Sequence, residues 1–284
     1  MVSPAASRPC HGCSAILEPM TQTNRLPEER LVGAPNFRSV SHLTGLDGAR
    51  LKPRRIFRSD GLHRLTDDDL PRLQSLGIGM VVDLRNRTER GTAPSRLPSP
   101  APTVHIHDSP PELAAVQGHG WREVIDEPSF DAAAAHAWMS NTYRRMPRAL
   151  APSVVAMVKS LGGIDQAAAP TVTHCMAGKD RTGFVIAVML KALGVGWDDI
   201  LTDYLHSNDR RPPEEFARSM LVFHGLPQNA RTVGAVTEVA AVYPDYLQAA
   251  LDSLQQDFGS IEAYLEAQGI TREALGRFRA ELLV

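Results

Sequence analysis

The sequence predicts an α/β fold with a central, mostly parallel β-sheet flanked by helices, and two observations carry this expectation. Short apolar runs rich in β-branched residues, such as residues 80–84, are typical of strands buried on both faces. Longer amphipathic stretches with helix-start signals lie between these runs. Strands that alternate with helices in this way favour a largely parallel sheet.

The first half of the domain contains three predicted strands and one well-marked helix. Residues 54–60 are expected to form a short strand that runs into a loop. Residues 66–76 form a predicted helix, because a capping threonine and three aspartates open it and leucines recur along one face. Gly77 ends this helix. A buried strand is then expected at residues 80–84, and another strand at residues 103–107.

The second half is predicted to be mostly helical around one further strand. An alanine-rich helix is expected at residues 131–146, where Pro147 interrupts the pattern. Residues 170–174 are the expected strand. Further helices are predicted at residues 153–161, 182–194, 246–258 and 261–268.

We expect one domain, preceded by a tail. Residues 1–29 are rich in Pro, Ser, Thr and charge without sustained periodicity, and we interpret them as a mobile N-terminal tail. Residues 30–284 form the single predicted domain. Within it, residues 109–150 read as a helical insertion between two core strands, either a lid over a site or a helix packed on the flank.

Composition limits the possible partners. Hydrophobic residues make up 43% and charged residues 22%, and the formal net charge is −2. This balance gives no reason to expect nucleic acid or an acidic membrane as a general partner. The longest apolar run, residues 184–190, is far shorter than the ~20 residues of a membrane-spanning helix. No membrane span is therefore expected.

The cysteines indicate a reducing compartment. Cys10, Cys13 and Cys175 are too few for a disulfide framework in a chain of 284 residues. Residues 1–20 also lack the continuous apolar core of a secretory signal. A cytoplasmic protein is expected, although unconventional export would leave no mark in the sequence.

The most informative segment runs from His174 to Gly183. A predicted strand delivers Cys175 to its C-terminal end, five residues follow, and Arg181 opens a helix. Backbone N–H groups of such a loop form an anion nest, and the helix N-terminus adds partial positive charge. Arg181 can clamp two phosphate oxygens, and the same field stabilises a thiolate. The pattern predicts in-line attack of Cys175 on a bound phosphate, with a cysteinyl-phosphate intermediate.

The string His174-Cys175-x5-Arg181-Thr182-Gly183 resembles the signature of the protein tyrosine phosphatase superfamily, and Ala-Gly-Lys-Asp-Arg-Thr-Gly resembles its bacterial branch. The resemblance covers the chain from about residue 30 to the end. The chain departs from the family after Arg38, where Ser39-Val-Ser-His-Leu replaces an acidic residue, Leu or Ile, and paired glycines. Further matches are residues 36–38, 57–60, 83–85 with Glu89, 204–208, 246–247 and 259–265.

The resemblance implies roles for the loop residues. His174 would orient the loop and support the thiolate, and the Thr182 hydroxyl would donate to the leaving sulfur. Arg58 and Arg85 would tie loops to carboxylates such as Glu89. Phosphate binding is expected from the loop itself, namely Met176, Ala177, Gly178, Lys179, Asp180 and Arg181.

Two aspartates are candidates for the general acid that protonates the departing oxygen. Asp180 lies beside Arg181, where the bacterial branch typically has an aspartate, and it is the favoured candidate. Asp83 ends a predicted strand, where a catalytic aspartate could also project. Lys179 adds a second cation, which either contacts further phosphates of an inositol ring or is simply solvated.

The expected activity is that of a cysteine-dependent protein tyrosine phosphatase that needs no cofactor or metal. Its substrate would be a phosphorylated protein, with phosphoserine, phosphothreonine and phosphoinositides as further options. A phosphoinositide or inositol phosphate phosphatase is the alternative, and a phosphate-binding pseudoenzyme is another. A metal enzyme is disfavoured because no histidines fall in a ligand spacing. An arsenate reductase would need resolving cysteines, and only Cys10 and Cys13 are spare.

Overall fold

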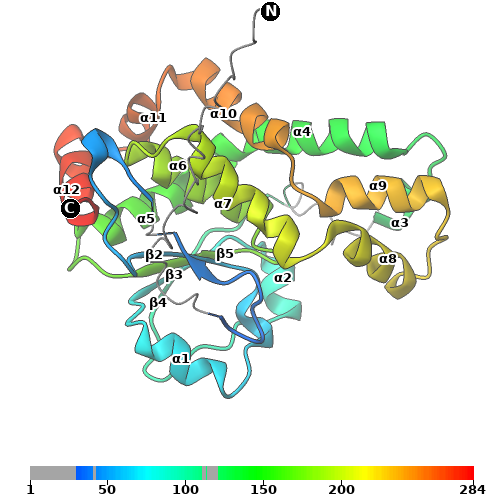
Figure 1. The fold of residues 1–284 in the computed structure, drawn as a ribbon, viewed down its shortest axis with the longest axis horizontal. Coiled ribbons are helices and arrows are strands. Elements are labelled where there is room, and N and C mark those ends of the chain that lie inside the picture. The colour runs from blue at the N-terminus through cyan, green and yellow to red at the C-terminus, as the bar shows by residue number, and fades with distance from the viewer. Residues whose placement is uncertain (1–29, 41–42, 111–112, 114–120) are drawn as a thin grey trace, which may run out of the picture.

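A five-stranded β-sheet in the order β1-β2-β5-β3-β4 forms the centre of the part of the chain that the structure describes (Figure 1). The structure is a computed structural model and describes residues 30–40, 43–110, 113 and 121–284. The predicted tail, with Cys10 and Cys13, lies outside these residues. Only β1 is antiparallel, so the predicted α/β class with a mostly parallel sheet is confirmed. The strands are β1 (Arg38–Ser39), β2 (Ile56–Ser59), β3 (Met80–Asp83), β4 (Thr103–Ile106) and β5 (Thr171–His174).

Strand β5 lies at the centre of the sheet, and its register aligns three strand ends. His174 pairs with Ser59 of β2 on one side and with Asp83 of β3 on the other. The residues that follow these strands therefore leave the sheet at one edge. Ligands bind outside the carboxyl ends of parallel strands in open α/β sheets, so this edge is where a site is expected.

Helices cover both faces of the sheet, because alternate strand residues point to opposite sides. Phe57 and Val81 belong to the apolar cluster that includes Leu73 of the first helix, whereas Ile56 and Val82 join the larger cluster on the other face. Figure 1 shows α1 on one side of the sheet and α5, α6 and α7 on the other. The α-helices of the described residues are α1 (Asp69–Ser75), α2 (Arg87–Thr92), α3 (Trp121–Asp126), α4 (Ala132–Ala149), α5 (Ala151–Gly162), α6 (Asp180–Ala192), α7 (Trp197–Arg210), α8 (Pro213–Phe223), α9 (Ala230–Ala240), α10 (Pro244–Phe258), α11 (Ile261–Ala267) and α12 (Arg272–Leu282), and two short 3₁₀ segments are Leu46–Gly48 and Leu62–Arg64.

Most predicted helix boundaries differ from the structure by one or two residues, and two helices differ by three. Helix α1 begins at Asp69 rather than at Thr66. Thr66 still caps this end, because it and Asp69 exchange hydrogen bonds between backbone N–H and side-chain oxygen, at 2.9 and 3.2 Å. The prediction that Pro147 interrupts its helix is wrong, since α4 continues to Ala149. Pro147 lies in the last turn of α4. The backbone hydrogen bond that its missing N–H removes is therefore close to the end of the helix.

A group of helices extends to one side of the sheet. Helix α4 packs along α9 and α10, and α8 packs along α9 (Figure 1). Helix α3 contacts α9. In the described residues, no helix has the length and apolar content to cross a membrane.

Candidate active site

The loop between β5 and α6 carries Cys175 at its first position and leads directly into Arg181. Cys175 is buried, with 2% of its surface exposed. The backbone N–H of Gly178 points back to the Cys175 Sγ at 3.3 Å. The loop therefore curls around the sulfur with an amide directed inward, as an anion nest requires.

Gly178 is needed at the turn of this loop for two independent reasons. Its φ is +68°, which residues with a side chain rarely adopt. A Cβ atom there would also lie 2.5 Å from the Asp60 nitrogen and 2.5 Å from the Ser59 carbonyl oxygen. Any side chain would push the loop away from the end of β2.

The loop carbonyls are held away from the nest by donors outside it. The Asn36 amide donates to the carbonyls of Ala177 and Gly178 at 3.1 and 3.0 Å. Arg58 Nη2 donates to the same Gly178 carbonyl at 2.7 Å, and the N–H of Gly61 donates to Met176 at 3.0 Å. In a trans peptide the N–H points opposite to the carbonyl, so the outward Ala177 carbonyl goes with the inward Gly178 N–H that bonds to the sulfur.

A buried ion network supports Arg58. Asp203 of α7 accepts from Arg58 Nη1 at 2.6 Å and from Arg38 Nε at 2.8 Å. Burial acts to raise the pKa of Asp203, but the two guanidinium groups outweigh it and hold that pKa well below its usual range. The carboxylate therefore stays ionised between two buried cations.

Arg181 is fixed by Glu89 in an end-on, bidentate pair. Its Nη1 and Nη2 each donate to a Glu89 oxygen at 2.7 Å, and Nη1 also donates to the Leu84 carbonyl at 3.1 Å. Burial acts to lower the pKa of Arg181, but Glu89 and the Cys175 charge hold it above its usual value. Glu89 is itself fixed, because it forms a capping box with Asn86 at the start of α2.

Arg58 and Arg85 each bond to a carboxylate, as expected, but Glu89, the carboxylate given as an example, pairs with Arg181 instead. Arg85 forms two side-chain hydrogen bonds with Asp83, at 2.9 and 2.7 Å. Burial acts to raise the pKa of Asp83, but the hydrogen bonds and the charge of Arg85 lower it overall. Asp83 is therefore an ionised, fully engaged carboxylate.

Asp180 opens α6 and bonds to Tyr143 of α4 and to its neighbour Lys179. Its Oδ1 accepts from the Tyr143 hydroxyl at 2.8 Å and from Lys179 Nζ at 2.7 Å. The Tyr143 hydroxyl also lies 2.7 Å from that of Tyr204. Within the described residues, Asp180 Oδ2 makes no hydrogen bond.

Lys179 is neither solvated nor free to reach a ligand. Its side chain is 7% exposed. The ammonium donates to Asp180 and to the carbonyls of Val239 and Ala241, at 2.7, 2.9 and 3.2 Å. An ammonium has three N–H donors, so the Lys179 donors are all occupied. The lysine ties the loop to the C-terminal end of α9.

His174 and Thr182 are completely buried beside the loop. His174 Nε2 lies 3.6 Å from Asp83 Oδ2, and Nδ1 is within hydrogen-bonding distance of the Cys175 carbonyl at 3.2 Å. Burial lowers the pKa of His174, which keeps the ring neutral near pH 7. The Thr182 hydroxyl has no hydrogen-bond partner among the described residues.

The structure also brings to the loop residues that sequence reasoning did not assign. These residues are Tyr143, Asp203, Asp60 and Arg211. Asp60 follows β2, is 1% exposed and accepts from the Asn36 N–H at 3.2 Å. Burial raises its pKa to about 6 against the opposing charge of Arg211. A charged residue on a buried helix face, as at Asp203, is the one sequence signal that could have indicated such a role.

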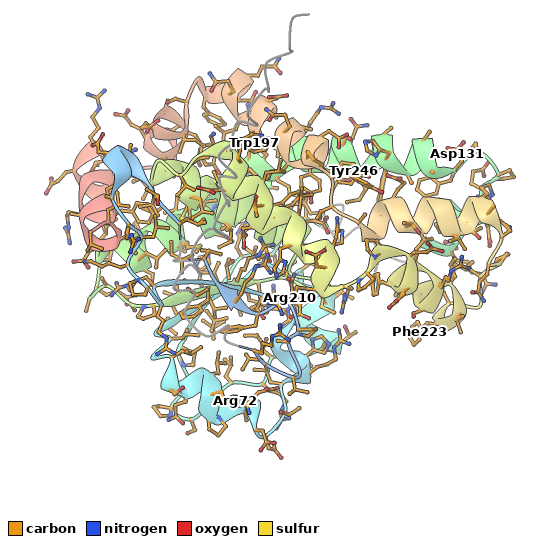
Figure 2. All side chains as sticks on the ribbon, viewed as in Figure 1. Arg72, Asp131, Trp197, Arg210, Phe223 and Tyr246 are labelled. Atoms are coloured by element: carbon orange, nitrogen blue, oxygen red, sulfur yellow. The ribbon has the colours of Figure 1, made fainter. Side chains whose placement is uncertain are left out.

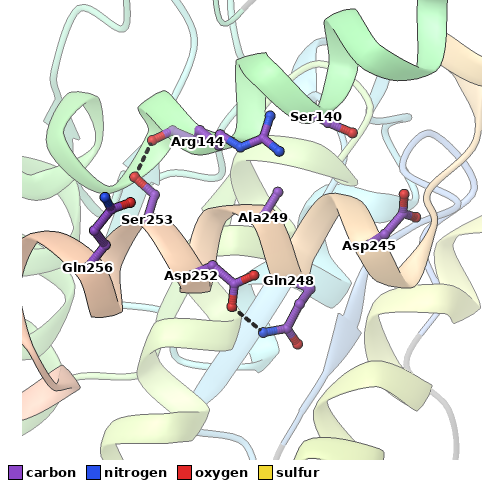
Figure 3. A pocket seen from close by; sticks show the side chains of 8 residues that line it. All are labelled: Ser140, Arg144, Asp245, Gln248, Ala249, Asp252, Ser253 and Gln256. Atoms are coloured by element: carbon purple, nitrogen blue, oxygen red, sulfur yellow. Dashed lines mark hydrogen bonds between the residues drawn. The ribbon is translucent and has the colours of Figure 1, made fainter.

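A separate hollow lies between α4 and α10 (Figure 3) and contains no residue of the cysteine loop. It is polar, and Figure 3 shows its groups bonded to each other, with Gln248 donating to Asp252 at 2.6 Å. The Ser253 hydroxyl donates to the Arg144 carbonyl at 2.9 Å. Among the described residues, no three His, Cys, Asp or Glu side chains are arranged to hold a metal.

Comparisons with known proteins agree with this loop. The model of the tyrosine phosphatase family matches residues 30–284. The chain is 34% identical over 280 residues to the triple specificity protein phosphatase PtpB of Mycobacterium tuberculosis, covering 89% of this chain and 98% of that protein. It is 30% identical over 247 residues to a protein of Cupriavidus necator named as a tyrosine-protein phosphatase, covering 81% and 80%. The resemblance inferred from the sequence is confirmed, and the chain belongs to the tyrosine phosphatase family.

Proposed function

We propose that the chain is a cysteine-dependent protein tyrosine phosphatase whose nucleophile is Cys175. The observation that carries the proposal is the loop that directs the Gly178 N–H to the sulfur at 3.3 Å and delivers Arg181 at its other end. A bound dianionic phosphate is stabilised by backbone N–H groups that point into the loop and by an arginine that contacts two of its oxygens. The same positive electrostatic field stabilises the cysteine thiolate.

The edge of Arg181 that would clamp the substrate follows from its hydrogen bonds. Glu89 occupies one N–H on Nη1 and one on Nη2, and Leu84 takes the second N–H of Nη1. Nε–H and the remaining N–H of Nη2 make no hydrogen bond within the described residues. These two donors lie on one edge of the guanidinium, which suits bidentate contact with two phosphate oxygens.

The proposed reaction has two steps. In the first, the Cys175 thiolate attacks phosphorus, the P–O bond to the tyrosine oxygen breaks, and that oxygen takes a proton from Asp180. In the second, Asp180 removes a proton from water as the water attacks phosphorus, and the S–P bond breaks to release inorganic phosphate and the thiolate. The Thr182 hydroxyl, which has no hydrogen-bond partner in the described part of the chain, is the proposed donor to the departing sulfur.

Asp180 is the proposed acid because one of its oxygens is held and the other is not. Tyr143 and Lys179 fix Oδ1, and this leaves Oδ2 to carry the proton. Asp83 lacks such an oxygen, since Arg85 bonds to both. We assign Asp83 to holding Arg85 and the end of β3.

We also assign a supporting role to the insertion at residues 109–150. Its helix α4 packs on the flank against α9 and α10 and supplies Tyr143 to Asp180. Of the two readings of this segment, lid or flank, these contacts favour the flank. A thiolate nucleophile also favours the reducing cytoplasm as the working compartment.

The test is turnover of a phosphotyrosine peptide by wild type and by Cys175→Ser in the presence of EDTA. Wild type should turn over in EDTA and be inhibited by vanadate. Cys175→Ser should lose turnover and still bind phosphate, whereas Arg181→Ala should lose both. A serine variant that retains turnover, or dependence on added metal, would refute the thiolate mechanism. A wild type that binds phosphate without turnover would establish a pseudoenzyme.

A further inference from the structure

Two tyrosine hydroxyls lie in the core beside Asp180, and neither takes part in the two proposed chemical steps. Tyr143 of α4 and Tyr204 of α7 are both completely buried. Their rings meet edge to face with centroids 6.5 Å apart, and their hydroxyl oxygens are 2.7 Å apart. Phenylalanine would fill the same space without burying a polar group, so packing alone does not account for these hydroxyls.

The hydrogen bonds of this pair run in one direction, toward Asp180. The Tyr143 hydroxyl donates to Asp180 Oδ1 at 2.8 Å, and this oxygen accepts whether or not Oδ2 carries a proton. Since the one hydrogen of Tyr143 is then used, the bond between the two hydroxyls is donated by Tyr204. In the described part of the chain, the Tyr204 hydroxyl makes no other hydrogen bond. A chain of donors therefore leads from Tyr204 through Tyr143 to Asp180 Oδ1.

Both tyrosine rings are held in place by their neighbours. A Cβ atom on Gly183 would lie 2.8 and 2.9 Å from two carbons of the Tyr204 ring, so this ring rests directly on the first turn of α6. Tyr246, which Figure 2 labels at the start of α10, packs against the Tyr143 ring with centroids 5.5 Å apart. Burial and the nearby Asp180 charge raise the pKa of both hydroxyls well above the ordinary value, so each keeps its proton to donate.

We propose that Tyr143 and Tyr204 are positioning residues for the general acid and that they affect the reaction only through Asp180. The proposal rests on the proposed function. As Asp180 releases its proton from Oδ2, negative charge develops on the carboxylate, and a hydrogen bond to a charged acceptor is stronger than one to a neutral acceptor. The chain of donors therefore stabilises Asp180 most while the proton is being transferred. By holding Oδ1, it also fixes the direction in which Oδ2 points.

Kinetics with two substrates that differ in their need for an acid test the chain of donors. Tyr143→Phe should lower kcat/KM for a phosphotyrosine peptide about tenfold, the size of one hydrogen bond to a charged group. The loss is smaller than that of the acid itself, because Lys179 still donates to Oδ1. An activated aryl phosphate, whose leaving group needs no proton, should stay within about twofold. The basic limb of the pH–rate profile should move to higher pH, since loss of a donor favours the protonated form of Asp180.

Tyr204→Phe tests the same chain from α7. It should show the same substrate dependence with a smaller loss, about threefold, because Tyr204 reaches Asp180 only through Tyr143. The double variant should match Tyr143→Phe alone, as expected for residues that act in series. The matched control is Tyr264→Phe, because Tyr264 is also buried and donates its hydroxyl to the Pro147 carbonyl at 2.7 Å. The control should leave kcat/KM for both substrates unchanged.

The Asp180→Asn background separates this proposal from the proposed function. There, Tyr143→Phe should cause no further loss on the peptide, and a further loss would show that Tyr143 acts elsewhere. Equal losses on both substrates in the wild-type background would mean that the tyrosines support only the loop. If Asp180→Asn loses peptide activity selectively and neither tyrosine variant does, the chain of donors is refuted while the acid stands. If Asp180→Asn shows no such selectivity, the assignment of the acid fails, and the role of the tyrosines fails with it.

Discussion

The cysteine loop is held by buried charges on two sides, and the two sides hold different parts of it. On the β2 side, Arg58 and Asn36 bond to peptide carbonyls, and Asp203 supports Arg58. On the β3 side, Glu89 bonds to a side chain, that of Arg181. The first side therefore fixes the shape of the loop, and the second orients one cation within it.

This difference predicts different consequences when a carboxylate is removed from either side. Without Asp203, two buried arginines would face each other without compensation, which is a cost to the whole fold. Without the Glu89 charge, Arg181 would remain near the thiolate and the phosphate but lose its alignment. Loss of Asp203 on the β2 side should therefore appear as instability, and loss of the Glu89 charge on the β3 side as lost catalysis.

The largest expected effect comes from Asp180, which belongs to neither side. Asp180→Asn should lower kcat/KM for a phosphotyrosine peptide by ~10²–10⁴-fold, because the phenolate must be protonated as it leaves. An activated aryl phosphate should lose much less, and the basic limb of the pH–rate profile should disappear. Asp83→Asn is the matched control and should cost little on either substrate. The reverse pattern would make the β3 side chemical rather than structural and break the comparison.

Asp203→Asn should lower the free energy of unfolding by about 3–5 kcal/mol, the cost of leaving buried charges unpaired. Urea unfolding followed by circular dichroism measures this loss. Glu214→Gln provides the control, because the Glu214–Arg218 pair is exposed and should contribute less than about 1 kcal/mol. An Asp203→Asn variant as stable as the control would show that the network does not support the fold.

Glu89→Gln should lower kcat/KM about 10–100-fold, since a small misplacement of a positioning group is costly. Stability should change by only about 1 kcal/mol, because glutamine can keep the capping box with Asn86. The measurement is kcat/KM together with the urea midpoint. The contradicting result would be a Glu89→Gln protein that loses as much stability as Asp203→Asn while its folded fraction keeps full kcat/KM. The two sides of the loop would then not differ in function.

The smallest effect concerns pH and Asp60. Its pKa in the folded protein is about 6, above the ordinary aspartate value of 3.8, so Asp60 removes stability as pH rises between these values. Asp60→Asn should therefore stabilise the protein at pH 7, on the order of 1 kcal/mol after its weaker hydrogen bonds are counted. Asp83 and Asp203 have lowered pKa values and act oppositely, losing their contribution as pH falls below about 4. Melting temperatures of wild type and Asp60→Asn from pH 3 to pH 8 should converge at the acid end.

Local patterns were sufficient to predict the strands and the loop, whereas long-range partners were not. The alternation of apolar runs and capped helices predicted β2, β3, β4 and β5 close to their observed bounds, and the spacing of Cys175 and Arg181 predicted the loop. The sequence pattern did not predict which partner each charged side chain contacts. Asp203 lies 145 residues from Arg58 in sequence, and Lys179 is buried by carbonyls at the end of α9. Such pairings depend on tertiary packing, which leaves no local periodic signal.

The central claim is that Cys175 is the nucleophile, and trapping the covalent intermediate tests it most directly. Wild type would be mixed with a phosphotyrosine peptide, quenched in acid within milliseconds, digested and examined by mass spectrometry. We predict a phosphoryl group on the Cys175 sulfur, formed in a burst approaching one per active chain and absent from Cys175→Ser. A phosphoryl group on another residue, or turnover with no label on Cys175, would contradict the account.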